Sequence, residues 1–284
     1  MKAKWLLVDD QKKLSRAVYD LERAEIIAID TEYDSFRYFR EKLCLLQVCA
    51  DRTAYIFDPL GDINLSFLQK YLEDPGKTKV LHAADNDIRL LKRDYGFRFN
   101  NIFDTHRAAL LLGFKELSLE KMIKEFLDED LGKSKKIQRS RWDNRPLTEE
   151  QLQYAVQDVL FLPNLYKTQS AHLRAKGLQD AAEKAFAKIA ATNWREKRID
   201  RRGYEKIEGY ASLTQEQKEL FKRLYIWRFY RAKDENRAVF MFLSDHHLLA
   251  LAQDARHPEK YLSQRKLSVY GSEIEKIIRT SERQ

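Results

Sequence analysis

Three short acidic patches, spread over about 130 residues, hold the side chains in this chain whose types and spacing suit chemistry. Asp30 and Glu32 follow an apolar run at residues 26–29, and their two-residue spacing puts both carboxylates on one face of a strand. Asp87 lies in the second patch. Tyr154 and Asp158, four residues apart, share one face of a helix. Oxygen ligands of this kind suit two hard divalent cations with a phosphate held between them.

Each patch also has a plainer interpretation when it is taken alone. An Asp-x-Glu sequence after a strand is usually the start of a solvated loop, and the helix dipole favours an acid such as Asp87 in a first turn. Tyr154 alone fits a half-buried aromatic residue on an amphipathic helix. Two carboxylates at the end of a buried strand are nevertheless costly unless a cation meets them.

The sequence around the patches resembles the three exonuclease motifs of ribonuclease D and its relatives, in the same order, over roughly residues 25–168. The matching segments are IAIDTEYDSFRYFREKLCLLQVC, LHAADNDIRLLKRDYGFRFNNIFDTHRAALLLGF (which includes Asp104) and QRSRWDNRPLTEEQLQYAVQDVLFLPNLY. The resemblance implies a 3′–5′ exonuclease with four acids and a tyrosine. It also implies an α/β domain with a mixed sheet of the ribonuclease-H-like type.

The same resemblance assigns a role to each residue. Asp30, Glu32, Asp87 and Asp158 would be catalytic ligands of two divalent ions, Mg²⁺ or Mn²⁺. Asp30 would bridge the ions, Glu32 and Asp158 would complete the site that activates water, and Asp87 would serve the leaving-group ion directly or through water. Tyr154 is expected to orient the water rather than take its proton, because a phenol with a pKa of about 10 is a weak base.

Two acids compete for the place in the second motif. The family pattern runs from a histidine through four residues to an Asp that precedes an apolar residue, which selects Asp87 before Ile88. Asp85 is then a helix N-cap or a first-turn acid. Arg141 departs from the family, since many relatives have an acid before the tryptophan, and we expect this change to affect contacts with the substrate backbone only.

Composition indicates a globular intracellular protein with a polyanionic substrate. At 284 residues the chain can bury a sizeable core and predicts two domains. It shows neither a signal peptide at MKAKWLLVDDQKK nor a run of about 18 apolar residues, so we expect a cytoplasmic protein without a membrane span. Cys44 and Cys49 fit neither a zinc pattern nor a disulfide framework and are expected to be buried free thiols.

Charge is distributed unevenly along the chain. Residues 1–170 hold 28 Lys and Arg against 28 Asp and Glu, so the whole net charge of +8 lies in residues 171–284. A basic cluster with an aromatic residue, at 133–145, adjoins the third motif. Although a solvated loop would look similar, its position favours contact with the substrate backbone. The expected substrate-binding residues are Lys136, Gln138, Trp142 and Arg145.

Periodicity and turn residues predict the elements that must position these side chains. We expect strands at 5–8, 43–49 and 54–57, a strand that ends at Asp30, and a turn at 58–61. A βα unit follows, with a strand at 79–81 and the helix of Asp87 at 87–93, and residues 104–172 are mostly helical. These elements define an expected exonuclease domain at 1–172 and a charged, partly helical connector at 173–209.

Residues 210–284 resemble the HRDC module, a small all-helical domain found after ribonuclease D and in RecQ-type helicases. Thr214 and Gln217 predict a capping box at the start of its first helix. The aromatic side chains of that helix are expected to form core rather than a base-stacking platform; they are Tyr225, Trp227 and Phe229. An anonymous helical bundle is the alternative.

Taken together, the sequence predicts a metal-dependent 3′–5′ exoribonuclease of the ribonuclease D type. We expect a monomer that acts on single-stranded RNA 3′ ends, in processing or decay, with tRNA precursors as candidate substrates. One alternative is a DNA exonuclease of related fold, because only contacts with the 2′-hydroxyl separate the two substrates. The other is a non-catalytic nucleic-acid-binding protein, but such a protein has no need of four acids that repel phosphate.

Overall fold

The computed structural model describes residues 4–132 and 135–281 of the chain. Two units follow from the packing within the chain. Unit 1 contains Met1–Asp34 and Leu43–Arg195, and unit 2 contains Ser35–Lys42 and Glu196–Gln284. The short loop 35–42 therefore belongs with the C-terminal part of the chain although it lies between two strands of unit 1.

Unit 1 is built on a six-stranded mixed sheet with the order β1-β4-β3-β2-β5-β6, which confirms the predicted α/β class. The pairs β1–β4, β2–β5 and β5–β6 are parallel, and the pair β3–β4 is antiparallel. The strands are β1 (Lys4–Val8), β2 (Ile26–Asp34), β3 (Lys42–Ala50), β4 (Thr53–Phe57), β5 (Thr78–Leu81) and β6 (Ile102–Asp104). The predicted strands at 5–8, 43–49, 54–57 and 79–81 are confirmed.

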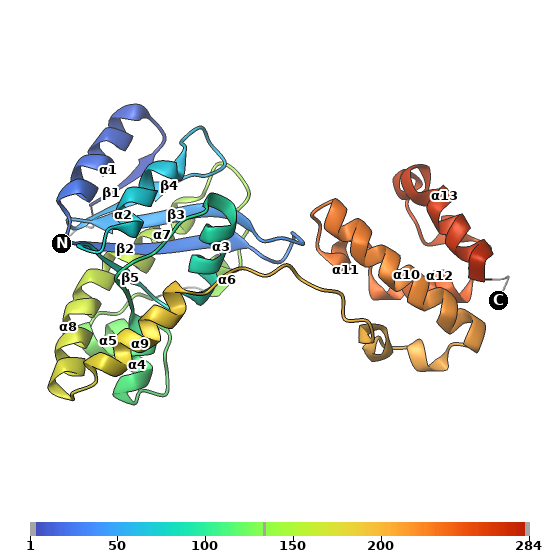
Figure 1. Ribbon diagram of the computed structural model, residues 1–284. Coiled ribbons are helices and arrows are strands. Elements are labelled where there is room, and N and C mark those ends of the chain that lie inside the picture. The colour runs from blue at the N-terminus through green and yellow to red at the C-terminus, as the bar shows by residue number, and fades with distance from the viewer. Residues whose placement is uncertain (1–3, 133–134, 282–284) are drawn as a thin grey trace. The chain divides into compact units, whose positions relative to one another are not determined.

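Helices cover the sheet of unit 1 (Figure 1). Side chains of α1, α2 and α3 lie against Ile27 and Ile29 on one face of β2. Helices α7 and α8 also pack against β2. The helices are α1 (Gln11–Arg23), the 3₁₀ turn η1 (Leu65–Leu68), α2 (Gln69–Glu73), α3 (Asp85–Tyr95), α4 (Thr105–Leu112), α5 (Leu119–Leu127), α6 (Lys135–Gln138), α7 (Glu149–Leu160), α8 (Leu162–Ala175) and α9 (Gln179–Ala190).

Two predicted boundaries near the acids are wrong. Strand β2 does not end at Asp30 but continues through Glu32 to Asp34, beside the equally long β3. Carboxylates look like loop residues in the sequence, yet neighbouring strands can still provide the backbone hydrogen bonds that extend a strand. Helix α3 begins at Asp85 rather than at Asp87, so Asp85 is a first-turn acid and not an N-cap.

Unit 2 is helical, with a core of its own. The predicted capping box is present: Thr214 Oγ1 accepts from the Gln217 N–H, and the Gln217 side chain accepts from the Thr214 N–H. Phe39, from the loop 35–42, is 3% exposed and packs in this core. The elements of unit 2 are η2 (Gly203–Lys206), η3 (Tyr210–Ser212), α10 (Gln215–Asp234), α11 (Val239–Phe242), α12 (Asp245–Gln253), η4 (Pro258–Lys260) and α13 (Gln264–Ser281).

Two further expectations concern thiols and membranes. Cys44 and Cys49 are buried and form no disulfide, as predicted, and burial raises the pKa of the Cys49 thiol to about 12. Within residues 4–132 and 135–281, no helix combines the length and the apolar character needed to cross a membrane.

Candidate active site

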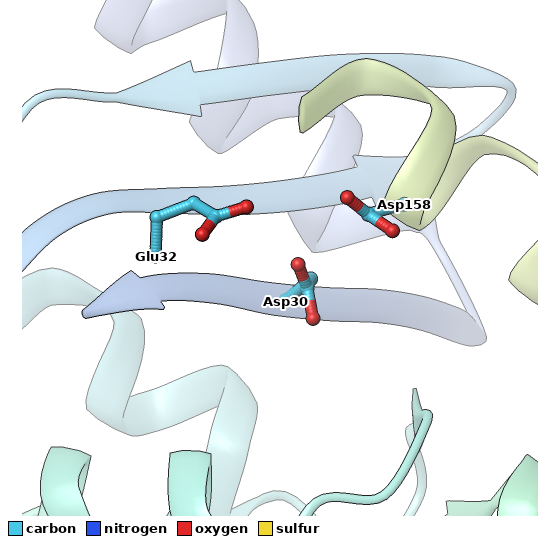
Figure 2. A group of neighbouring side chains, drawn as sticks. All are labelled: Asp30, Glu32 and Asp158. Atoms are coloured by element: carbon cyan, nitrogen blue, oxygen red, sulfur yellow. The ribbon is translucent and has the colours of Figure 1, made fainter. Parts of the chain in front are cut away.

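Strand β2 and helix α7 bring three carboxylates together. Asp30, Glu32 and Asp158 each offer an oxygen atom, and these oxygens all lie within 4.8 Å of one another (Figure 2). Ile27 and Ile29 face the side of the sheet that α1, α2 and α3 cover, so the strand alternation turns Asp30 and Glu32 to the other side. Helix α7 packs against β2 and adds Asp158, which is 8% exposed.

Helix α7, which contains the candidate catalytic residues Tyr154 and Asp158, is capped at its start. Thr148 and Gln151 form a capping box, and Gln151 Nε2 also donates to Ser140 Oγ at 2.9 Å. Because a cap of this kind satisfies exposed N–H groups of the first turn, it defines where the helix begins. Tyr154 and Asp158 then follow on the same face of α7.

The Tyr154 hydroxyl lies in the electric field of the three acids. Burial is the main cause that raises its pKa, and the charges of Asp158, Glu32 and Asp30 raise it further. The phenol therefore keeps its proton at neutral pH and can donate a hydrogen bond. Its ring centroid lies 6.0 Å from that of Trp142, so the tyrosine is backed by a second aromatic side chain.

Asp87 is not a member of the group of three closely spaced acids, although the charge of Asp158 is among the causes that raise its pKa. Among the described residues, the group of closely spaced oxygens contains Asp30, Glu32 and Asp158, and Asp87 instead accepts a hydrogen bond from Thr31 Oγ1. Because side chains alternate along a strand, Thr31 lies on the same face of β2 as Ile27 and Ile29. It therefore points toward α3 and away from Asp30 and Glu32. Burial raises the pKa of Asp87 to about 6, against the hydrogen bond from Thr31, which lowers it.

Asp104 anchors the helix that contains Asp87. Its fully buried carboxylate accepts from the Ala84 N–H and from the Arg107 N–H, each at 2.7 Å, so one side chain joins the starts of α3 and α4. Burial raises the pKa of Asp104. Ala83, which precedes Ala84 in the chain, has a φ of 57° and is therefore in the left-handed conformation. The hydrogen bond from the Ala84 N–H to Asp104 helps to hold this conformation. Asp85, by contrast, forms a partly exposed ion pair with Arg107 at 3.3 Å.

Two of the four expected substrate-binding residues, Trp142 and Arg145, make several contacts within the protein. Trp142 is only 3% exposed, and its Nε1 donates to the Gln138 carbonyl at 3.2 Å. Arg145 donates to both carboxylate oxygens of Asp58, at 2.5 and 2.6 Å, and to the Cys44 carbonyl at 2.8 Å. Direct contact with the substrate stays a prediction for these two side chains, whose described contacts lie within the protein.

Lys136 and Gln138, in the short helix α6, have exposed side chains and stay predicted substrate contacts. Residues 133–134 of the basic cluster lie outside the described residues. Thr31 and the Asp58–Arg145 pair were not anticipated. Thr31 could have been found from its place between two acids, since a strand turns every second side chain to the opposite face. No local sequence pattern predicts the Asp58–Arg145 ion pair, because the two residues are 87 positions apart in the sequence.

The chain matches two known families. Residues 6–173 match the family described as 3′–5′ exonuclease, and residues 217–278 match the HRDC domain. The exosome complex component 10 homolog of Drosophila melanogaster is 34% identical over 263 residues, which cover 87% of this chain and 28% of that protein. Ribonuclease D of Shewanella sp. (strain ANA-3) is 28% identical over 289 residues, which cover 97% of this chain and 72% of that protein.

Solved structures show a similar fold. The catalytic core of RRP6 from Trypanosoma brucei, in a mutant form, has a TM-score of 0.87 and 23% identity, with 99% of this chain and 81% of that chain covered. Brucella melitensis NrnC with bound Mg²⁺ has a TM-score of 0.56 and 24% identity, with 76% of this chain and 98% of that chain covered. At these identities the likeness concerns the fold.

Proposed function

The chain belongs to the 3′–5′ exonuclease family, and on that premise we propose that it is a metal-dependent 3′–5′ exoribonuclease. The two family matches confirm the resemblance to ribonuclease D and to the HRDC module. One observation supports the proposed chemistry above all. Three carboxylates from β2 and α7 have oxygens within 4.8 Å of one another, beside a protonated tyrosine.

The donor set fits hard divalent cations, because these ions prefer carboxylate oxygens. We propose that Asp30, Glu32 and Asp158 would hold two such ions, Mg²⁺ or Mn²⁺, and that Asp30 would serve both. When bound, the ions supply a water of lowered pKa and stabilise the charge of the reacting phosphate. Without cations the three acids would repel both one another and a phosphodiester, which argues against a plain binding protein.

The remaining site residues act through positioning. Tyr154 keeps its proton, so it can donate to the attacking water and fix its direction rather than serve as the base. The hydrogen bond from Thr31 holds the Asp87 carboxylate in one orientation. We propose that Asp87 completes the metal-binding set from there, directly or through water.

RNA is the proposed substrate, with single-stranded 3′ ends as the point of attack. Among the relatives, one is named a ribonuclease D and another an exosome complex component, and this chain spans only 28% of the latter. The net charge of +8 supports a polyanionic substrate. Precursors of tRNA stay candidate substrates within this class.

The test uses RNA and DNA oligomers of the same sequence, labelled at either end, with Mg²⁺, Mn²⁺ or EDTA. A 5′-labelled RNA should shorten one nucleotide at a time, and a 3′-labelled RNA should release a labelled mononucleotide from the first moment. EDTA should stop both reactions. Internal fragments, release from the 5′ end or digestion in EDTA would contradict the proposal, and faster digestion of DNA would favour the DNA exonuclease alternative.

A further inference from the structure

Unit 2 contains an aromatic groove that the exonuclease site does not use. It has a volume of about 500 Å³ and is lined by the loop 35–42, the segment 197–200, α10 and α11. Two phenylalanines of the lining are exposed: Phe36 is 61% exposed and Phe240 is 49% exposed. Their ring centroids are 5.0 Å apart with an interplanar angle of 59°, so the two rings form a tilted pair, and the Arg37 guanidinium lies 5.8 Å from the Phe36 ring centroid.

Hydrogen bonds and an aromatic contact hold the loop 35–42 against the rest of unit 2. Within unit 2 the Ala238 N–H donates to the Arg37 carbonyl at 2.9 Å, and the Arg40 N–H donates to Asn236 Oδ1 at 2.7 Å. Both bonds tie the loop to residues 236–238, which lead into α11. The Phe39 ring packs edge-on against Phe229, with centroids 5.1 Å apart. The exposed rings are therefore presented by a built surface, and exposing two large apolar rings side by side is unusual on a surface without a partner.

Charge identifies the kind of partner. Unit 2 holds 22 Lys and Arg against 15 Asp and Glu, whereas unit 1 holds 30 against 29. Two of the cations that line the groove are paired, Arg228 with Asp245 at 2.7 Å and Lys197 with Glu41 at 3.2 Å. Arg198, also in the lining, is exposed, and it makes no hydrogen bond or ion pair with any described residue. The lining holds three cations against one acid, Asp200, which pairs with Lys206 at 3.0 Å. A lining with this excess of cations and with exposed aromatic side chains complements a polyanion that has planar rings.

We propose that this groove binds unstacked bases of single-stranded RNA, with Phe36 and Phe240 against the bases and Arg198 on the phosphate backbone. The proposal rests on the proposed exoribonuclease function and names a binding site for the same substrate. Every base has an aromatic face, so the site would be tolerant of sequence. In the sequence, Phe36 follows Glu32 by four residues.

Binding to the full-length chain in EDTA tests the groove without cleavage. The probes are a single-stranded RNA of about 12 nucleotides, within the range that such grooves cover, and the matching duplex. The variants Phe36→Leu and Phe240→Leu keep an apolar side chain but remove the ring. Each should weaken binding of the single strand roughly fivefold to a hundredfold and leave the duplex unaffected. Tyr19→Leu is the matched control, since Tyr19 is 55% exposed on α1 of unit 1.

Salt dependence tests the phosphate contact separately. Arg198→Gln should flatten the log–log dependence of affinity on salt by about 0.7, the value for one neutralised phosphate of a single strand. Arg256→Gln removes an exposed arginine of unit 2 that does not line the groove, and it should leave the slope unchanged. An equal slope change in both variants would mean that the charge acts diffusely and not in this groove.

A fluorescence measurement provides a readout that does not depend on affinity. Phe240→Trp places an indole in the lining of the groove, and stacking on a base should quench it when single-stranded RNA is added. Val269→Trp, at a site 57% exposed on α13, should show no change beyond that of the parent chain. This variant tests the groove even if a leucine variant fails to fold.

The two proposals can fail separately. Unchanged affinity in both leucine variants, together with an unquenched Trp at position 240, would overturn the groove and make this surface a site for a protein partner. Digestion of RNA from its 3′ end would still support the exonuclease. Conversely, an intact chain that binds single strands through the groove but releases no nucleotide with Mg²⁺ would refute the exonuclease alone.

Discussion

A single threonine shows how closely residue order controls this site. Thr31 lies between Asp30 and Glu32, and the strand turns it to the opposite face, where its hydroxyl donates to Asp87. The same three-residue segment therefore provides two carboxylates for the acid group and one donor for the fourth acid. The roles proposed for these residues lead to three predictions at the residue scale.

Asp30→Asn should abolish cleavage and leave the fold intact. The change removes one negative charge from the acid group but almost no volume from β2, so metal binding is lost rather than packing. Loss of one strong electrostatic interaction typically lowers the rate about 10²–10³-fold, and a shared ligand should cost more. The measurement is the rate of release from a 3′-labelled RNA with Mg²⁺, with circular dichroism to check folding. A wild-type rate would rule out the two-metal proposal.

Tyr154→Phe separates positioning from metal binding. The variant keeps the ring that packs near Trp142 and removes only the hydroxyl. We expect the turnover rate to fall about 10–10³-fold with little change in the Mg²⁺ concentration that gives half-maximal activity. Parallel Mg²⁺ titrations of both proteins measure the two quantities. A rate within twofold of wild type would make Tyr154 a structural residue.

Asp85 and Asp87 offer an internal control within one turn of α3. Asp87→Asn should remove most activity, because the carboxylate that Thr31 orients loses its charge. Asp85→Asn should be nearly silent, since Asp85 forms only a partly exposed ion pair with Arg107 and such pairs contribute little. Single-turnover cleavage of the same RNA compares the variants. The reverse pattern would show that the second motif is displaced by two residues.

At the scale of elements, buried carboxylates and caps decide where the helices begin. Asp104 joins the starts of α3 and α4, and the capping box of Thr148 and Gln151 fixes the start of α7. Helices α3 and α7 contain Asp87, Tyr154 and Asp158. The geometry of the site therefore depends on polar contacts that lie outside it.

Asp104→Ala should destabilise unit 1 by about 2–6 kcal/mol. The change leaves the N–H groups of Ala84 and Arg107 without their acceptor, and each buried unsatisfied group costs about 1–3 kcal/mol. Urea unfolding followed by circular dichroism measures the loss. Thr148→Ala provides the comparison, with an expected cost of about 1 kcal/mol for a lost helix cap. Equal, small effects of both variants would mean that Asp104 is not the anchor described.

At the scale of the whole molecule, unit 2 includes a short loop that lies in the sequence between two strands of unit 1. The loop 35–42 leaves β2 and enters β3, yet its Phe39 packs in the core of unit 2. Unit 2 also holds 22 of the chain's 52 Lys and Arg against 15 of its 44 Asp and Glu. Removal of unit 2 should therefore affect both stability and RNA affinity.

A chain that ends at residue 195 should keep its acid group but bind RNA more weakly. Its salt dependence should be flatter by about 0.7 for each phosphate that unit 2 neutralises in the full chain. Phe39, now without its core, becomes an exposed apolar residue and should promote aggregation. Phe39→Ser in the shortened chain should reduce light scattering and leave the affinity unchanged. Equal affinity and salt slope in the shortened and full chains would make unit 2 a stabilising or protein-binding element.

The sequence alone determined the local features of this protein. Periodicity and apolar runs predicted the strands, and a Thr-x-x-Gln pattern predicted the capping box of α10. The resemblance to the ribonuclease D motifs selected the four acids and Tyr154. These features depend on neighbours a few residues apart, so their physical causes can be read along the chain. The family matches then confirmed the resemblance that the motifs implied.

Only the tertiary structure decided which distant side chains meet. It brought oxygens of Asp30, Glu32 and Asp158 within 4.8 Å of one another, set Asp87 against Thr31, buried Trp142 and paired Arg145 with Asp58. It also grouped the loop 35–42 with residues 196–284. Such contacts depend on how sheets and helices pack, and a carboxylate or an arginine has the same local sequence signature whether it meets a metal, a phosphate or another side chain.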